Sequence, residues 1–219
     1  FRRVDALREN DPEASFYLGL VALRQEQWPA AAHAFERYVS QQQASRPAVF
    51  VNLAYAYEQM GEMDRARAAM ADALSHGGRG DPLVQTNAAA MAVAASDYET
   101  ADAALAAART LWGPRRPPPV WFHYAGLAAA MVNDLDRAIA LLGEAVQVYP
   151  SYAVPWNNLA VAYEARGDFD DALRTVERGL IEDSTLPQLH RNFADSLQRD
   201  GRFDEAREAY RRAHTLDAL

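Results

Sequence analysis

The histidines are the first residues whose side chains could do chemistry, because imidazole binds metals and transfers protons near neutral pH. No two of them have the i, i+4 spacing with an intervening Glu that places a zinc site on one helix face. The five are His33, His76, His123, His190 and His214. Only His123 is expected on a binding surface, where a lone imidazole more often forms a hydrogen bond than ligates a metal. We therefore predict no metal site.

Other groupings of reactive residues have structural explanations. The 219-residue chain has no Cys and no Lys, which excludes thiolate nucleophiles, disulfides, Schiff bases and the lysine of a phosphate-binding loop. No Ser lies in a Gly-x-Ser-x-Gly motif. Carboxylates cluster where helices are expected to start, a position that the helix dipole favours, and these are Glu99, Asp102, Asp168, Asp170 and Asp171. We predict a protein that is not an enzyme and binds no cofactor.

Two short motifs could bind ligands. The stretch 77–81 is glycine-rich and contains Arg79-Gly80-Asp81, a triplet found in adhesion peptides. It is expected to follow a helix rather than a strand, so we interpret it as a loop between helices rather than a phosphate site. Pro114 and Pro117 have the PxxP spacing of a ligand for an aromatic groove, but a stiff linker is the favoured interpretation.

The composition describes a folded acidic protein. Half of the residues are hydrophobic, and the net charge of -8 disfavours a nucleic acid as the main partner. No apolar run approaches the roughly 20 residues that a membrane helix needs. Abundant Ala and Arg without Lys suggest a GC-rich, bacterial genome. The absence of Cys fits both the cytoplasm and the periplasm, so the compartment stays open, with the cytoplasm favoured.

The chain contains an internal repeat of about 34 residues. Ala138, Ala172 and Ala206 lie 34 residues apart, and upstream Ala residues continue the pattern with short insertions. The period predicts six repeats, at residues 12–45, 47–80, 82–115, 119–152, 153–186 and 187–219. Residues 113–118 are interpreted as a Pro-rich insertion between the third and fourth repeats.

Each repeat is expected to form two helices. In the fifth repeat the apolar residues recur at helical spacing in two stretches, first Trp156, Leu159, Ala160 and Tyr163 and then Phe169, Ala172, Leu173 and Val176. Between the stretches, Gly167 can take a left-handed conformation that ends the first helix, and Asp168 can cap the second. Because two helices cannot bury their apolar faces alone, neighbouring repeats must stack into an α-solenoid.

Three positions recur in all six repeats. A small residue in the first helix is followed by an Ala and then a bulky residue in the second. The small position holds Gly19, Ala54, Ala89, Gly126, Ala160 and Ala194; the alanine position holds Ala31, Ala66, Ala101, Ala138, Ala172 and Ala206; the bulky position holds Phe35, Met70, Leu105, Leu142, Val176 and Tyr210. This pattern resembles the tetratricopeptide repeat (TPR) family. The resemblance implies an all-α fold, a right-handed α-α superhelix, and binding of protein or peptide partners.

The two ends indicate a piece of a longer array. Residues 1–11 are interpreted as the tail of a preceding repeat, because Phe1 lies 34 residues before Phe35. The sixth repeat is followed by no polar capping helix, which such arrays usually have. We therefore expect an excerpt of a longer protein. Uncapped ends would also allow one copy of the chain to associate with another.

The resemblance places the binding surface on the first helices, which line the concave face in this family. The candidate residues are Phe16, Tyr17, Leu20, Val51, Asn52, Tyr55, Thr86, Asn87, His123, Tyr124, Leu127, Asn157, Asn158, Val161, Arg191, Asn192 and Asp195. Four of the Asn residues share one position, where an amide can bond either a bound peptide backbone or a neighbouring helix. We predict an apolar or aromatic peptide, held by Phe16, Tyr55 and Leu127 through buried area and by the Asn row through backbone hydrogen bonds. The alternative is a substrate-recruiting array of a larger glycosyltransferase, kinase or peptidase.

Overall fold

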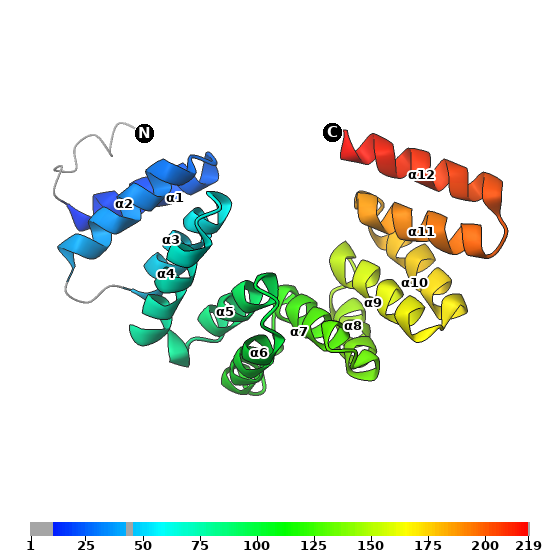
Figure 1. The fold of residues 1–219 in the computed structure, drawn as a ribbon, viewed down its shortest axis with the longest axis horizontal. Helices are drawn as coiled ribbons and strands as arrows, with labels where there is room; N and C mark the ends of the chain where they lie inside the picture. Colours follow the sequence, from blue (N-terminus) through cyan, green and yellow to red (C-terminus); the bar gives the residue numbers. More distant parts are fainter. Residues whose placement is uncertain (1–10, 43–45, 219) are drawn as a thin grey trace. The chain divides into compact units, whose positions relative to one another are not determined.

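The computed structural model describes residues 11–42 and 46–218, and over these ranges all regular elements are helical (Figure 1). A 3-10 turn spans Gly78–Gly80. The α-helices are α1 (Pro12–Arg24), α2 (Trp28–Gln41), α3 (Pro47–Gln59), α4 (Met63–Ser75), α5 (Pro82–Ala94), α6 (Tyr98–Trp112), α7 (Pro119–Met131), α8 (Leu135–Val148), α9 (Ala153–Arg166), α10 (Phe169–Glu182), α11 (Pro187–Arg199) and α12 (Phe203–Asp217). These twelve helices of the described ranges fit about six helix pairs, which confirms the all-α solenoid class.

The chain divides into two compact units, each with its own core. The N-terminal unit comprises Phe1–Met91 and Ala106–Trp112, and the C-terminal unit comprises Ala92–Leu105 and Gly113–Leu219. The N-terminal core is built mainly from α2, α3 and α4, around Phe35 and Phe50. The main C-terminal core runs through α8, α9 and α10, around Leu142.

The small position of each repeat exists because the first helix touches the bulky residue of the second. A Cβ added to Gly126 would lie 2.5 Å from Cγ of Leu142, and one added to Gly19 would lie 2.5 Å from Cε1 of Phe35. The alanine position is also tight, since Ala172 is fully buried and its equivalents in the other repeats are at most 3% exposed. The pattern therefore fixes how closely the paired helices approach.

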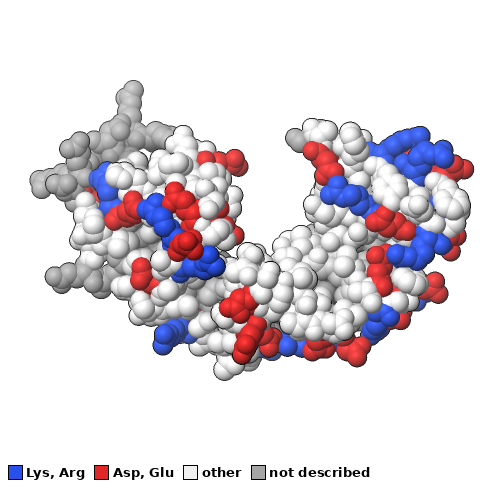
Figure 2. Space-filling model, viewed as in Figure 1, with Lys and Arg blue, Asp and Glu red and all other residues white. Residues whose placement is uncertain are grey.

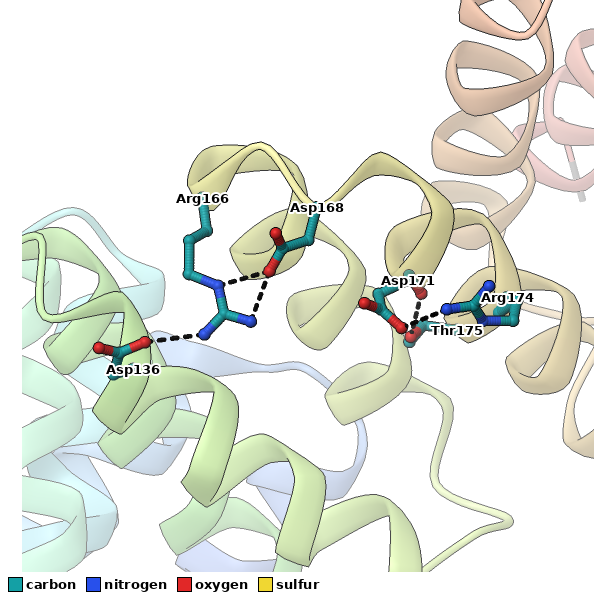
Figure 3. A network of polar contacts seen from close by, with 6 residues as sticks. All are labelled: Asp136, Arg166, Asp168, Asp171, Arg174 and Thr175. Carbon is teal, nitrogen blue, oxygen red and sulfur yellow. Dashed lines mark hydrogen bonds and ion pairs between the residues drawn. The ribbon is translucent and has the colours of Figure 1, made fainter.

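The turn between α9 and α10 confirms one sequence prediction and corrects another. Gly167 has a φ of 90°, the left-handed conformation expected of it. The prediction that Asp168 caps α10 is wrong, because its side chain accepts no backbone hydrogen bond there. Its Oδ2 instead pairs with the Arg166 guanidinium at 2.5 Å, and that guanidinium also reaches Oδ1 of Asp136 on α8 at 2.7 Å (Figure 3). The turn is thus tied to the preceding repeat.

The Pro-rich insertion is anchored at its end. Pro117 is buried, and its carbonyl accepts a hydrogen bond from the Tyr149 hydroxyl at 2.8 Å. Since a PxxP ligand must present both prolines to its partner, this anchoring disfavours the ligand interpretation. The Arg79-Gly80-Asp81 triplet is likewise used locally, because Oδ1 of Asp81 accepts the backbone N–H of Leu83 at 2.8 Å and starts α5.

Two expectations extend beyond what the helices show. The expected tail of a preceding repeat, residues 1–11, lies outside the described residues except for Asp11. Leu219, the last residue of the sixth expected repeat, also lies outside them. The repeat boundaries stay a prediction. In the described part of the chain, the helices are too short or too polar to cross a membrane.

Candidate binding surface of the first helices

In the N-terminal unit, two tyrosines are the exposed aromatic residues of the candidate surface. Tyr17 on α1 is 54% exposed and Tyr55 on α3 is 46% exposed. The Tyr55 ring stands edge-on to the Trp28 ring of α2, with 5.7 Å between the ring centroids. Two large amphipathic rings that present area to solvent are suited to bury surface against a ligand.

The other apolar candidates of this unit contribute mainly to the core. Phe16, Leu20 and Val51 are partly buried and pack against the N-terminal core. The Phe16 ring lies 6.2 Å from the Phe35 ring and 5.8 Å from the Tyr38 ring. Only the part of the Phe16 side chain that stays exposed is therefore available for the predicted contact with a peptide.

The polar candidates on α5 bond their own helix. Thr86 is buried, and its hydroxyl donates to the Pro82 carbonyl at 2.7 Å. The exposed Asn87 donates through Nδ2 to the Leu83 carbonyl at 2.9 Å. In α3, Asn52 is half-buried. The four Asn residues that share a sequence position thus have different environments.

In the C-terminal unit, three amides and an imidazole form a chain of hydrogen bonds across three first helices. Asn192 of α11 donates through Nδ2 to Oδ1 of Asn157 on α9, at 2.8 Å. Asn157 donates to Oδ1 of its neighbour Asn158 at 3.3 Å, and Nδ2 of Asn158 lies 2.8 Å from Nδ1 of His123 on α7. We refer to these four residues as the amide ladder.

The ladder assigns a protonation state to His123. Because Asn158 Nδ2 is a donor, Nδ1 of His123 must accept, which requires the neutral imidazole. Burial lowers the pKa of His123 and so favours the same neutral form. Among the described residues, no three His, Cys, Asp or Glu side chains gather as a metal site would require. His123 is a hydrogen-bond partner in this structure.

Apolar side chains run beside the ladder. Val161 on α9 is 45% exposed, Met131 at the end of α7 is 53% exposed, and Val120 is exposed as well. Leu127 and Tyr124 are partly buried. α7 has no charged residue, and the surface over it is correspondingly free of charge in Figure 2. The ladder therefore borders an uncharged apolar strip.

Sequence reasoning missed Val120 and Met131. They lie seven residues before and four residues after Leu127, which is the spacing of one helix face. Extending the face from Leu127 by this rule would have found both.

The charged candidates of α11 are engaged with α12. Arg191 Nη1 pairs with Oδ2 of Asp217 at 2.5 Å. Asp195 accepts a hydrogen bond from the Tyr210 hydroxyl, and this bond raises the pKa of Tyr210. Both side chains are held within their own repeat, so they are less suited to ligand contacts than the ladder.

Comparison with known sequences supports this description of the chain. Two family models, each described as tetratricopeptide repeat, match residues 129–191 and residues 2–48 and 17–82. Tetratricopeptide repeat protein 36 of Bos taurus is 35% identical over 40% of this chain and 49% of its own length. The chain spans from about a quarter to about half of the curated relatives it matches. A mammalian relative leaves the bacterial origin a prediction.

Solved structures share the fold at low sequence identity. The APC/C hetero-tetramer Cut9-Hcn1 has a TM-score of 0.83 at 16% identity, covering 98% of this chain and 42% of that chain. YrrB, described as a TPR protein with an unusual peptide-binding site, has a TM-score of 0.60 at 18% identity, covering 85% and 93%. Paired helices, small and bulky positions in contact, and matching family models agree: the chain belongs to the tetratricopeptide repeat family.

Proposed function

We propose that this chain is a protein-interaction scaffold whose first helices bind a peptide or a partner helix and so assemble or regulate a complex. The observation that carries the proposal is the combination, on first helices, of exposed large apolar side chains with a row of amides. Tyr17 and Tyr55 are the exposed side chains in the N-terminal unit. In the C-terminal unit, Val161 and Met131 are exposed on the helices that carry the amide ladder. YrrB gives an example of peptide binding on this fold.

The ladder supports both structural and binding roles. Its bonds link α7, α9 and α11, so they fix neighbouring first helices. An amide has two donor hydrogens and two acceptor lone pairs, and each ladder bond uses only one of these. The remaining groups of Asn157 and Asn158 are therefore able to bond an extended peptide backbone, each bond contributing on the order of 1 kcal/mol.

The proposal is tested with peptides selected from a random library on the whole chain. Affinities are measured for wild type, for Tyr55→Ala and for the double variant Asn52→Ala, Asn158→Ala. We expect Tyr55→Ala to raise the dissociation constant of peptides that bind the first helices about tenfold, because burying a large side chain contributes roughly 1.5 to 3 kcal/mol. Ile181→Ala is the matched control, since Ile181 is 82% exposed on a second helix. If both test variants bind the selected peptides as tightly as Ile181→Ala does, the first helices are not the interface.

A second candidate is an array that recruits substrates to an enzyme domain of a longer protein. Its supporting observation is the greater length of the curated relatives. TPR arrays are generally non-catalytic, so a glycosyltransferase, kinase or peptidase activity would have to come from another domain. The full-length open reading frame discriminates the two candidates.

A further inference from the structure

An open furrow lies between α8 and α10, apart from the surface described above. It has a volume of about 640 Å³, within the range of ligand pockets in proteins. Trp156 and Leu159 of α9 form its floor, Gly143 and Val146 line the α8 side, and Arg178 lines the α10 side. None of its lining residues belongs to the candidate surface of the first helices. We call it the α8–α10 furrow.

The same furrow recurs one repeat later. Between α10 and α12, a furrow of about 550 Å³ is lined largely by residues one period further on, so that Leu180, His190, Phe193 and Arg212 take the places of Val146, Trp156, Leu159 and Arg178. The recurrence shows that the furrow follows from how second helices stack on the intervening first helix. The differences between the two furrows then indicate what is particular to the first.

The first particular feature is a tryptophan beneath the arginine, because the second furrow has Arg212 in place of Arg178 but His190 in place of Trp156. On the α10 wall, Oδ1 of Asp171 pairs with Arg174 at 2.7 Å, and the Thr175 hydroxyl bonds the Asp171 carbonyl (Figure 3). Arg178 lies over the Trp156 ring, 5.7 Å from its centroid, and no carboxylate of the described residues forms an ion pair with it. Glu182, one helical turn further, also lines the furrow. A cation that forms no ion pair with the described residues thus lies over the Trp156 ring.

The second particular feature of the α8–α10 furrow is the open space at Gly143. A Cβ built on Gly143 would meet no heavy atom within 4 Å, so nothing in the packing requires glycine. Its φ is not among the positive values of the described glycines. Glycine inside a helix is unfavourable relative to Ala, and the next two repeats hold Glu177 and Arg211 at this position. The absence of a side chain widens the furrow opposite Trp156.

We propose that the α8–α10 furrow is a second protein-binding site, which takes a partner segment with a large apolar side chain next to an acidic residue. The apolar side chain lies on Trp156 in the space left by Gly143. The carboxylate pairs with Arg178, and a basic residue beyond it is complementary to Glu182. This site is independent of the first-helix surface, so one chain is able to hold two partners or two segments of one partner.

The test uses the random peptide library on the whole chain, with each selected peptide measured against variants. We expect a class of peptides with an apolar–acidic pair whose dissociation constant rises five- to tenfold in Arg178→Gln, because a charged hydrogen bond is lost. The same peptides should bind more weakly to Gly143→Gln, whose side chain fills the furrow. Gly143→Ala narrows the furrow while keeping the helix intact. Arg67→Gln, on an exposed Arg of α4, is the matched control.

The outcomes separate this proposal from the preceding one. Peptides weakened by Arg178→Gln and Gly143→Gln but not by Tyr55→Ala support the furrow site. If no selected peptide responds to these two variants more than to Arg67→Gln, the furrow is not a binding site, whatever the result for Tyr55→Ala. If selected peptides respond to the furrow variants but none responds to the first-helix variants, the proposed function is overturned and the furrow site is supported.

Discussion

The imidazole of His123 can accept a hydrogen bond from Asn158 only while it is neutral. Burial lowers its pKa, so its folded state favours the neutral form relative to the unfolded chain. A group whose pKa is lowered on folding binds fewer protons when folded. Its contribution to stability is complete above the ordinary His value of about 6.5 and is lost as the pH falls from there through the folded pKa.

Acidification is therefore expected to destabilise the protein partly through His123. Between about pH 7.5 and about pH 5.5 the free energy of unfolding should fall more for wild type than for His123→Gln. Chemical denaturation at the two pH values measures this. His214→Gln, an exposed His of α12, is the control and should retain the wild-type dependence. Equal slopes for wild type and His123→Gln would remove His123 from the account.

Residue-level prediction reached its limit at the ladder. The sequence singled out His123 as a hydrogen-bond partner and placed Asn158 and Asn192 at one repeat position. It left open whether these amides bond a ligand or a neighbouring helix. The hydrogen bond between Asn192 and Asn157 depends on the rotation of α11 against α9, which is a property of packing that a repeat pattern does not contain.

At the scale of helices, contact between the small and bulky positions explains why the pattern predicted the fold well. A period of 34 residues and helical apolar spacing locate both helices of each repeat, because the core demands apolar residues at those positions. Turn details were less predictable: Asp168 has the right residue type for a cap, but a neighbouring Arg166 competes for its carboxylate. Local propensity fails where an ion pair offers the same group another partner.

Two Gly→Ala changes in the same helix pair should act in opposite directions. Gly126→Ala places a Cβ 2.5 Å from Leu142 and should destabilise by roughly 1 to 3 kcal/mol through overpacking. Gly143→Ala meets no neighbour and should stabilise by about 0.5 to 1 kcal/mol, since Ala is the better helix former. Thermal and denaturant unfolding measure both. The reverse order would show that the helices are paired differently.

The whole molecule is stabilised by contacts between sequence neighbours. Each compact unit has its own core, and exposed ion pairs such as Arg166–Asp136 and Arg199–Glu164 link successive repeats. Such surface pairs contribute at most about 1 kcal/mol each, so core packing dominates. In repeat arrays of this kind, stability is approximately a sum of repeat and nearest-neighbour terms.

A core lesion in one repeat is therefore expected to act locally. Ala172→Leu inserts methylenes at a fully buried position and should destabilise by about 1 to 3 kcal/mol. Amide hydrogen exchange should accelerate in α9, α10 and α11, whereas α3 and α4 should keep their wild-type protection. Ala140→Leu, on the exposed face of α8, is the matched control. Acceleration spread evenly over the chain would mean that it unfolds as a single cooperative unit.

The first helices are proposed as the partner-binding surface, and side-chain footprinting tests this role most directly. Peptides are selected on the Arg178→Gln variant, so that furrow-binding peptides are removed, and hydroxyl-radical oxidation is then compared with and without peptide. We predict protection of Tyr17 and Tyr55, or of Met131, all exposed side chains on first helices. Phe169 and Phe203, which are exposed on second helices, should be unaffected. Protection of these phenylalanines with unchanged oxidation of Tyr17, Tyr55 and Met131 would contradict the account.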